Sequence, residues 1–181
     1  MTPNFLLGKT GVTTGKIIDV FPSDEVKTYR RKIKYIYSVN NEYYSDFKRL
    51  GTKDGGQKIG NDVKVIYSLK NPRRNNIEIL LNNKRTRSEK FYSNKKNGYI
   101  EMQLINGVFK YKEFAEQGKI VKDFVGEYSL DNDSLKFEHY YSGKNSVENQ
   151  KSTLFVFDTK NSNRLIDVKT KQIFRRVRAG R

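Results

Sequence analysis

Apolar and polar residues alternate along most of the chain, a period of two that is typical of strands with one buried face. In the first half the alternation predicts strands over residues 12–21, 31–39, 42–47, 62–69 and 76–81. In the second half it predicts strands over 99–105, 108–114, 122–130, 135–141, 153–158, 165–168 and 173–177. We therefore expect an all-β protein with little helix, made of two small antiparallel β barrels or sheets in tandem.

Two strands of the first half indicate which side chains are buried. From Ile33 onward their odd-numbered positions are apolar or aromatic: Ile33, Tyr35, Tyr37, Val39, Val63, Val65, Tyr67 and Leu69. Their even-numbered positions, and the residue that follows the second strand, supply the cations Lys32, Lys34, Lys64 and Lys70. We expect the tyrosines to form an inward row and the lysines an exposed basic row.

Turn residues separate the strands of the second half. Asn106-Gly107 is a pair favoured in a two-residue type I′ hairpin turn, because both positions need a positive φ. With such a turn, Leu104 lies opposite Phe109, and Met102 lies opposite Tyr111. Further turns are expected at residues 131–134 and 161–163.

The alternation is interrupted at residues 82–98, which are polar, basic and poor in core-forming side chains. This composition predicts a linker, within which a short exposed helix is compatible with the sequence, and a boundary near residue 90. Residues 1–90 then form a small β domain with the linker at its end. Residues 91–181 form an antiparallel β-meander domain.

The chain of 181 residues has a net charge of +16 and a pI near 9.8. Residues 1–90 hold 19 of its 36 basic and 9 of its 20 acidic side chains, so both halves are basic. A spread positive charge favours an acidic protein or an anionic surface as the partner, with nucleic acid as an alternative. The sequence has no cysteine, which excludes thiolate metal sites, and no apolar run long enough for a membrane span.

An ordered set of residues in the first half resembles a known family. The set consists of Gly11-Val12-Thr13-Thr14-Gly15-Lys16-Ile17, Tyr35-x-Tyr37-x-Val39, Gly60-x-x-Val63-x-Val65-x-Tyr67 and Asn71-Pro72. Over roughly residues 10–80 it resembles a bacterial domain-of-unknown-function family of small β modules, often found beside membrane helices. The resemblance implies a bacterial module near the envelope, without assigned catalytic residues. This sequence lacks the neighbouring membrane helix, which keeps a cytoplasmic location as the alternative.

The second half resembles the meander of lipocalin-like sheets at Gly126-Glu127-Tyr128-Ser129-Leu130 and Leu135-Lys136-Phe137. This second resemblance concerns a fold pattern and implies no ligand.

Candidate catalytic and metal-binding groups lack the patterns that their chemistry needs. Gly8-Lys9-Thr10 has Pro3 where a phosphate-binding loop needs glycine. The only histidine, His139, has no nucleophile-elbow motif beside it and is expected to pack in its strand. The segment 131–133 lacks the glycine and glutamate of a calcium loop, and Glu127, Glu138 and Asp158 lie on ordinary alternating strands. We expect no enzyme, no cofactor and no metal.

Basic side chains are the remaining candidates for function. Tyr29 to Tyr35 interleaves cations with rings, as platforms for single-stranded nucleic acid do, but the alternation sends Tyr35 and Tyr37 to the core. The chain end from Arg175 onward is expected to fray. Candidate contact residues for an anionic partner are Arg30, Lys32, Lys34, Lys64, Lys70, Arg73, Arg74, Arg175, Arg176 and Arg178.

These observations predict a non-enzymatic β-rich binding or interaction module with a basic surface for an acidic partner. A basic nucleic-acid-binding protein is the alternative. An inhibitor or immunity protein acting on an acidic target is a third, less favoured hypothesis.

Overall fold

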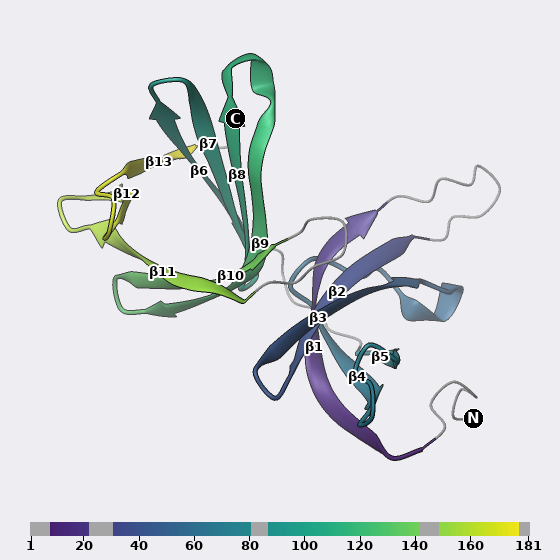
Figure 1. Ribbon diagram of the computed structural model, residues 1–181. Helices are drawn as coiled ribbons and strands as arrows, with labels where there is room; N and C mark the ends of the chain where they lie inside the picture. Colours follow the sequence, from purple (N-terminus) through teal and green to yellow (C-terminus); the bar gives the residue numbers. More distant parts are fainter. Residues whose placement is uncertain (1–7, 22–30, 81–86, 142–148, 178–181) are drawn as a thin grey trace. The chain divides into compact units, whose positions relative to one another are not determined.

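The computed structural model describes residues 8–21, 31–80, 87–141 and 149–177, with the backbone alone at 139–141 and 149–151 (Figure 1). The chain forms two compact units, Met1–Arg85 and Thr86–Arg181. Both are antiparallel β structures, which confirms the predicted fold class. The only helical segments in the described residues are the short 3-10 turns η2 (Thr52–Asp54) and η3 (Glu116–Gly118).

The first unit is a five-stranded sheet in the order β3-β2-β1-β4-β5. Its strands are β1 (Thr10–Phe21), β2 (Lys32–Val39), β3 (Glu42–Arg49), β4 (Asp62–Ser68) and β5 (Asn75–Ile79). The sheet is strongly curled (Figure 1). Side-chain hydrogen bonds connect its two edge strands, β3 and β5. Lys48 Nζ of β3 donates a 2.7 Å hydrogen bond to the Ile77 carbonyl of β5, and Asn75 Nδ2 donates to Asp46 Oδ2 at 3.1 Å.

The inner face of this sheet holds the predicted apolar row. Tyr35 and Tyr37 are 2% and 3% exposed, so the prediction that these rings belong to the core is confirmed. They pack with Ile17, Ile33, Val39, Leu50, Val63, Val65 and Ile77. The expectation for Leu69 is wrong, because β4 ends at Ser68 and Leu69 is 54% exposed.

Gly15 allows the close approach of strands that the curl requires. It pairs with Tyr37 on one side and Val63 on the other, and it is buried. A Cβ atom at this position would lie 2.7 Å from the Ile36 carbonyl oxygen and 2.9 Å from a methyl group of Val65. Glycine is therefore the residue that fits without moving backbone.

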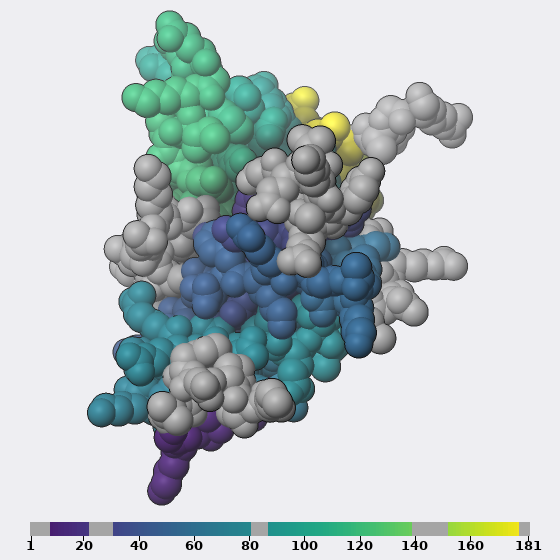
Figure 2. Space-filling model, turned by 90° about the vertical axis from the view of Figure 1, so that its right-hand side faces the viewer, coloured from purple at the N-terminus to yellow at the C-terminus, as the bar shows by residue number. Residues whose placement is uncertain are grey.

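The second unit is a closed eight-stranded barrel. Each strand pairs with its neighbours in sequence, and the last strand closes the barrel on the first, as in up-and-down barrels. The strands are β6 (Ser88–Lys95), β7 (Gly98–Ile105), β8 (Val108–Ala115), β9 (Ile120–Asp131), β10 (Ser134–Tyr141), β11 (Asn149–Asp158), β12 (Asn161–Asp167) and β13 (Ile173–Val177). The β8–β9 hairpin, green in Figures 1 and 2, projects beyond the body of the barrel.

The predicted β7–β8 hairpin is confirmed in register. Leu104 lies opposite Phe109 and Met102 opposite Tyr111. Asn106 has a φ of 48° and Gly107 a φ of 85°, both positive as a type I′ turn requires.

Two local predictions in the second half are wrong. The expected linker, residues 82–98, contains all of β6, whose Phe91 is 1% exposed in the core. The division between the units accordingly falls after Arg85, before the expected boundary near residue 90. The expected turn at 161–163 begins β12, because Asn161 already pairs with Asp158.

Phenylalanine rings occupy the middle of the barrel. Phe137 lies between Phe109 and Phe155, with ring centroids 4.3 and 4.7 Å away, and Phe155 meets Phe174 at 5.6 Å. Phe91 completes the set of fully buried rings. The barrel interior is thus a packed core in which four of the five rings, Phe109, Phe137, Phe155 and Phe174, form one chain of ring contacts.

Candidate partner-binding surfaces and a polar barrel end

The predicted basic face of the first unit exists, but its lysines have other contacts. Strand pairing sets Lys34 opposite Phe47 and Lys32 opposite Phe21. The Phe47 ring lies beneath both ammonium groups, with Lys32 Nζ 4.3 Å and Lys34 Nζ 5.5 Å from its centroid. These two lysines therefore cover an exposed ring through cation–π contacts.

Further along the same face, carboxylates and an apolar side chain interrupt the row. Lys64 forms an ion pair with Glu78 at 2.8 Å, and Ile36, opposite Lys16, is buried. Lys70 does not belong to the row, because it lies beyond the end of β4. The expected row of Lys32, Lys34, Lys64 and Lys70 is therefore wrong in including Lys70, and its other three lysines contact an aromatic ring or a carboxylate.

Lys70 belongs instead to a turn that connects β4 and β5, residues 70–74, which we call the basic turn. Backbone hydrogen bonds run from Ser68 N–H to the Arg74 carbonyl at 2.9 Å and from Arg74 N–H to the Asn71 carbonyl at 2.9 Å. The Asn71 side chain accepts a further bond from Arg73 N–H at 3.1 Å. The Asn71-Pro72 pair thus makes a turn that is ordered from within.

The buried tyrosines of the first unit support the basic turn from the inside. The Tyr37 hydroxyl donates to the Pro72 carbonyl at 2.7 Å, and the Tyr35 hydroxyl donates to Asn75 Oδ1. Asn75 Nδ2 is within 3.1 Å of the Arg73 carbonyl. Burial, aided by the nearby Asp46 carboxylate, raises the pKa of both tyrosines far above 10, so both retain the protons that they donate.

The basic turn exposes three cations. Lys70, Arg73 and Arg74 all have exposed side chains, and none of them forms an ion pair with a carboxylate in the part of the chain that the structure describes. The structure thus brings together three of the ten predicted contact residues on a backbone that hydrogen bonds hold in place.

The predicted cations near the chain end do not form one cluster. Arg175 and Arg176 lie within β13, contrary to the expectation of a frayed end, and adjacent strand residues face opposite ways. Arg175 points outward, opposite Tyr92, whereas Arg176 lies 5.5 Å from the buried Phe91 ring and pairs with Glu89 at 3.2 Å. Arg30 and Arg178 lie outside the described residues.

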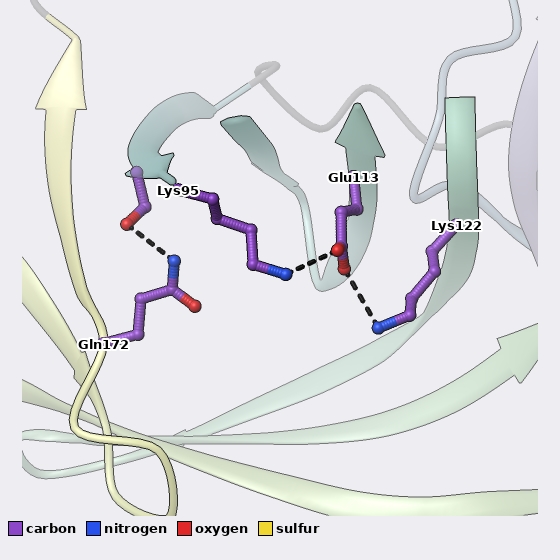
Figure 3. A network of polar contacts seen from close by, with 5 residues as sticks. Lys95, Glu113, Lys122 and Gln172 are labelled. Carbon is purple, nitrogen blue, oxygen red and sulfur yellow. Dashed lines mark hydrogen bonds and ion pairs between the residues drawn. The ribbon is translucent and has the colours of Figure 1, made fainter. Parts of the chain in front are cut away.

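A polar cluster at one end of the barrel interior has no counterpart among the predicted sites (Figure 3). Glu113 continues the inward row of Phe109 and Tyr111 on β8 and is 8% exposed. Lys95 of β6 donates a hydrogen bond to its Oε1, and Lys122 Nζ of β9 lies 3.0 Å from its Oε2. Beside them, Gln172 donates to Ser93 Oγ, and Ser93 Oγ donates to the Ile173 carbonyl.

The two ammonium groups decide the ionisation of Glu113. Burial alone raises the pKa of this carboxyl, but the hydrogen bonds and charges of Lys95 and Lys122 outweigh it and hold the pKa below its ordinary value of 4.5. Burial, with the charges of Glu113 and Asp167, raises the pKa of the adjacent Tyr111 above 10. An ionised carboxylate between two lysines is a poor proton donor, and its contacts instead join β6, β8 and β9 near the tip of the β8–β9 hairpin, close to η3.

The other candidate groups of the sequence remain scattered. Glu127 lies opposite Glu138 on β9 and β10, and Asp158 lies 3.7 Å from Arg164. Residues 131–134 make the β9–β10 turn. The side chain of His139 is outside the described part, and within that part no three histidine, aspartate or glutamate side chains are grouped as metal ligands.

Over the described ranges, no helix has the length and apolarity needed to cross a bilayer. No family model, curated protein or solved structure matches the chain.

Proposed function

We propose that this protein is a non-enzymatic binding module whose basic turn binds an acidic protein partner. The observation that carries the proposal is the presence of three exposed cations without ion pairs, Lys70, Arg73 and Arg74, on a turn ordered by hydrogen bonds. Arginine can donate two parallel hydrogen bonds to one carboxylate, so adjacent arginines suit a partner rich in Asp and Glu. An ordered backbone also reduces the entropy lost on binding.

An acidic protein suits the basic turn better than single-stranded nucleic acid does. Recognition of single strands combines cations with exposed rings on which bases stack. The rings that support this turn, Tyr35 and Tyr37, are buried. An inhibitor or immunity protein directed at an acidic target is one form that this function takes, and the resemblance of residues 10–80 to small bacterial β modules supports a place near the envelope.

The proposal is tested by the affinity for a fluorescein-labelled polyglutamate peptide, measured by anisotropy at about 50 mM salt, where electrostatic binding is strong. The triple variant K70S/R73S/R74S removes the cations of the basic turn. We expect it to lose about tenfold or more in affinity, since hydrogen bonds to charged groups contribute about 1.5–3 kcal/mol each.

The matched control is R31S/K53S/K58S, which removes three exposed cations elsewhere in the same unit. This control is expected to bind polyglutamate as the unmodified protein does. An equal loss in both variants would mean that only net charge matters. If the basic-turn variant lost affinity for single-stranded DNA and kept it for polyglutamate, nucleic acid would be the partner of this turn.

A further inference from the structure

The outer face of four barrel strands carries an ordered set of basic and aromatic side chains. Strand pairing places one row across β8, β7, β6 and β13, made of Lys112, Glu101, Tyr92 and Arg175. Directly opposite residues of antiparallel strands share a face. Because the alternate residues Phe91 and Met102 point into the core, this row points outward.

A second outward row lies one step along the strands and consists of Lys110, Gln103, Lys90 and Val177. Members of both rows line a groove of about 420 Å³. Neighbouring strands lie about 4.8 Å apart and alternate residues of one strand about 6.8 Å apart, so the lysines are spread along the groove. A spread of cations suits a polymer with repeated negative charges better than it suits a single small anion.

Three stacked rings extend this surface from Tyr92 of the first row to Tyr99 and Phe114, which lie on the other side of that row. Tyr92, Tyr99 and Phe114 come from three adjacent strands and stack with centroid distances of 5.3 and 4.5 Å. All three are partly exposed, unlike the buried tyrosines of the first unit. We call these three rings the aromatic ladder. Tyr99, in the middle, stacks on a ring at each of its two faces, so Tyr92 and Phe114 each have one face that no ring of the ladder covers.

We propose that this barrel face, defined by the two rows and the aromatic ladder, binds single-stranded nucleic acid. Lys90, Lys112 and Arg175 would contact phosphates, while bases lie against the ladder, the combination used on sheet platforms for single strands. This site lies in the unit Thr86–Arg181. It is a second binding function, separate from the binding of an acidic protein by the basic turn, which lies in the other unit.

The rings favour nucleic acid over an acidic peptide at this face. Carboxylates need only the cations, and stacked rings beside the groove add nothing to their recognition. A base has a π face that stacks on an aromatic side chain whatever its sequence, so binding here is expected to depend on the presence of bases and little on their order.

The test uses the full chain and two labelled probes of equal length and charge, an oligothymidylate and its abasic counterpart. We expect the oligothymidylate to bind at least about fivefold more tightly, the low end for one stacked base. The variant K90S/K112S/R175S should lose at least tenfold in affinity, and the slope of log affinity against log salt should fall by about 2, because each phosphate contact on a single strand contributes about 0.7.

Two further variants test whether binding depends on the barrel face or only on net charge. K136S/K160S/K169S removes three exposed lysines of the same unit away from the groove and should change neither the affinity nor the salt slope. Y99L/F114L should abolish the preference for the oligothymidylate over the abasic probe. If this variant does not fold, the comparison of the two probes on the unmodified protein still decides the role of the bases.

Absence of binding at about 50 mM salt, where electrostatic attraction is strong, would overturn the proposal. Equal affinity for the two probes, or an equal loss in the K136S/K160S/K169S control, would also do so. The basic-turn variant K70S/R73S/R74S should keep its oligothymidylate affinity, and K90S/K112S/R175S should keep its polyglutamate affinity. Either proposal can therefore fail without the other.

Discussion

The ion pairs of Glu113 at the polar end of the barrel predict how the stability of the protein depends on pH. Replacement of Glu113 by glutamine keeps the shape of the side chain and removes its charge. The carboxylate is largely buried, but the side chains of Lys95 and Lys122 are 38% and 53% exposed. Breaking a fully buried ion pair costs about 3–5 kcal/mol, whereas exposed pairs contribute about 0–1 kcal/mol each. Because both lysines are partly exposed to solvent, their ion pairs with Glu113 contribute less than fully buried pairs would. We therefore expect E113Q to lower the free energy of unfolding by about 1–2 kcal/mol at neutral pH.

The pH dependence has a definite sign. The pKa of Glu113 is lower in the folded protein than its ordinary value of 4.5, so the unfolded chain binds the proton more readily. The contribution of this carboxylate is therefore complete above the unfolded pKa and disappears as the pH falls through the folded pKa. The difference in stability between the unmodified protein and E113Q should be largest near neutral pH and should shrink in acid.

Urea unfolding followed by circular dichroism, repeated from neutral pH down into acid, measures this difference. E101Q is the matched control, because Glu101 is an exposed carboxylate on the outer face of the barrel. It should change the free energy of unfolding by less than about 0.5 kcal/mol. An E113Q protein as stable as the unmodified one at neutral pH, or a difference that stays constant into acid, would refute the role assigned to the two ion pairs.

Three other substitutions test the packing of the two units. G15A should destabilise the curled sheet by about 1–3 kcal/mol through overpacking against Ile36, seen as a lower melting temperature, while G56A, where nothing lies within 4 Å, should not. Y37F leaves the Pro72 carbonyl without its donor and should cost about 0.5–1.5 kcal/mol in urea unfolding; no change would mean that the hydroxyl does not support the basic turn. F137A removes a ring that packs against Phe109 and Phe155 and should cost about 3–5 kcal/mol; a loss below about 1 kcal/mol would contradict the packed core.

Local patterns in the sequence were enough to predict most strands and the β7–β8 register. The alternation identifies strands whose inner face is apolar. Asn106-Gly107 sets the register of β7 and β8, because a two-residue turn allows only one pairing of the two strands. The alternation does not identify β6, because Phe91 is the only strong core former among the inward residues of this strand. Its other inward residues, Ser93 and Lys95, are polar and point into the polar end of the barrel. Their partners there, Gln172 and Glu113, are distant in sequence, so the sequence around β6 alone does not show that these two residues face inward.

The candidate surfaces were harder to predict than the strands. Lys70, Arg73 and Arg74 are close in sequence, so their grouping in one turn follows from local structure. Arg175 and Arg176 are also adjacent, yet the strand sends them to opposite faces. The aromatic ladder needs the register of three strands, and two of its rings, Tyr99 and Phe114, are separated in sequence by the inward-pointing Phe109 and Tyr111. Composition therefore revealed the excess of positive charge but not the surfaces on which it gathers.

Closure of the barrel has a consequence for how the chain matures during synthesis. Every other strand pair in this unit joins sequence neighbours, but β6 meets β13 only through Tyr92–Arg175, Phe91–Arg176 and Lys90–Val177, pairs that span nearly the whole unit. On the ribosome the seven neighbouring pairings can form one after another as the chain emerges, whereas this last one waits for residues 173–177 to leave the exit tunnel. Until then the first strand has an open edge capable of pairing with another nascent chain. The final strand is thus the step at which the barrel passes from an aggregation-prone sheet to a closed molecule.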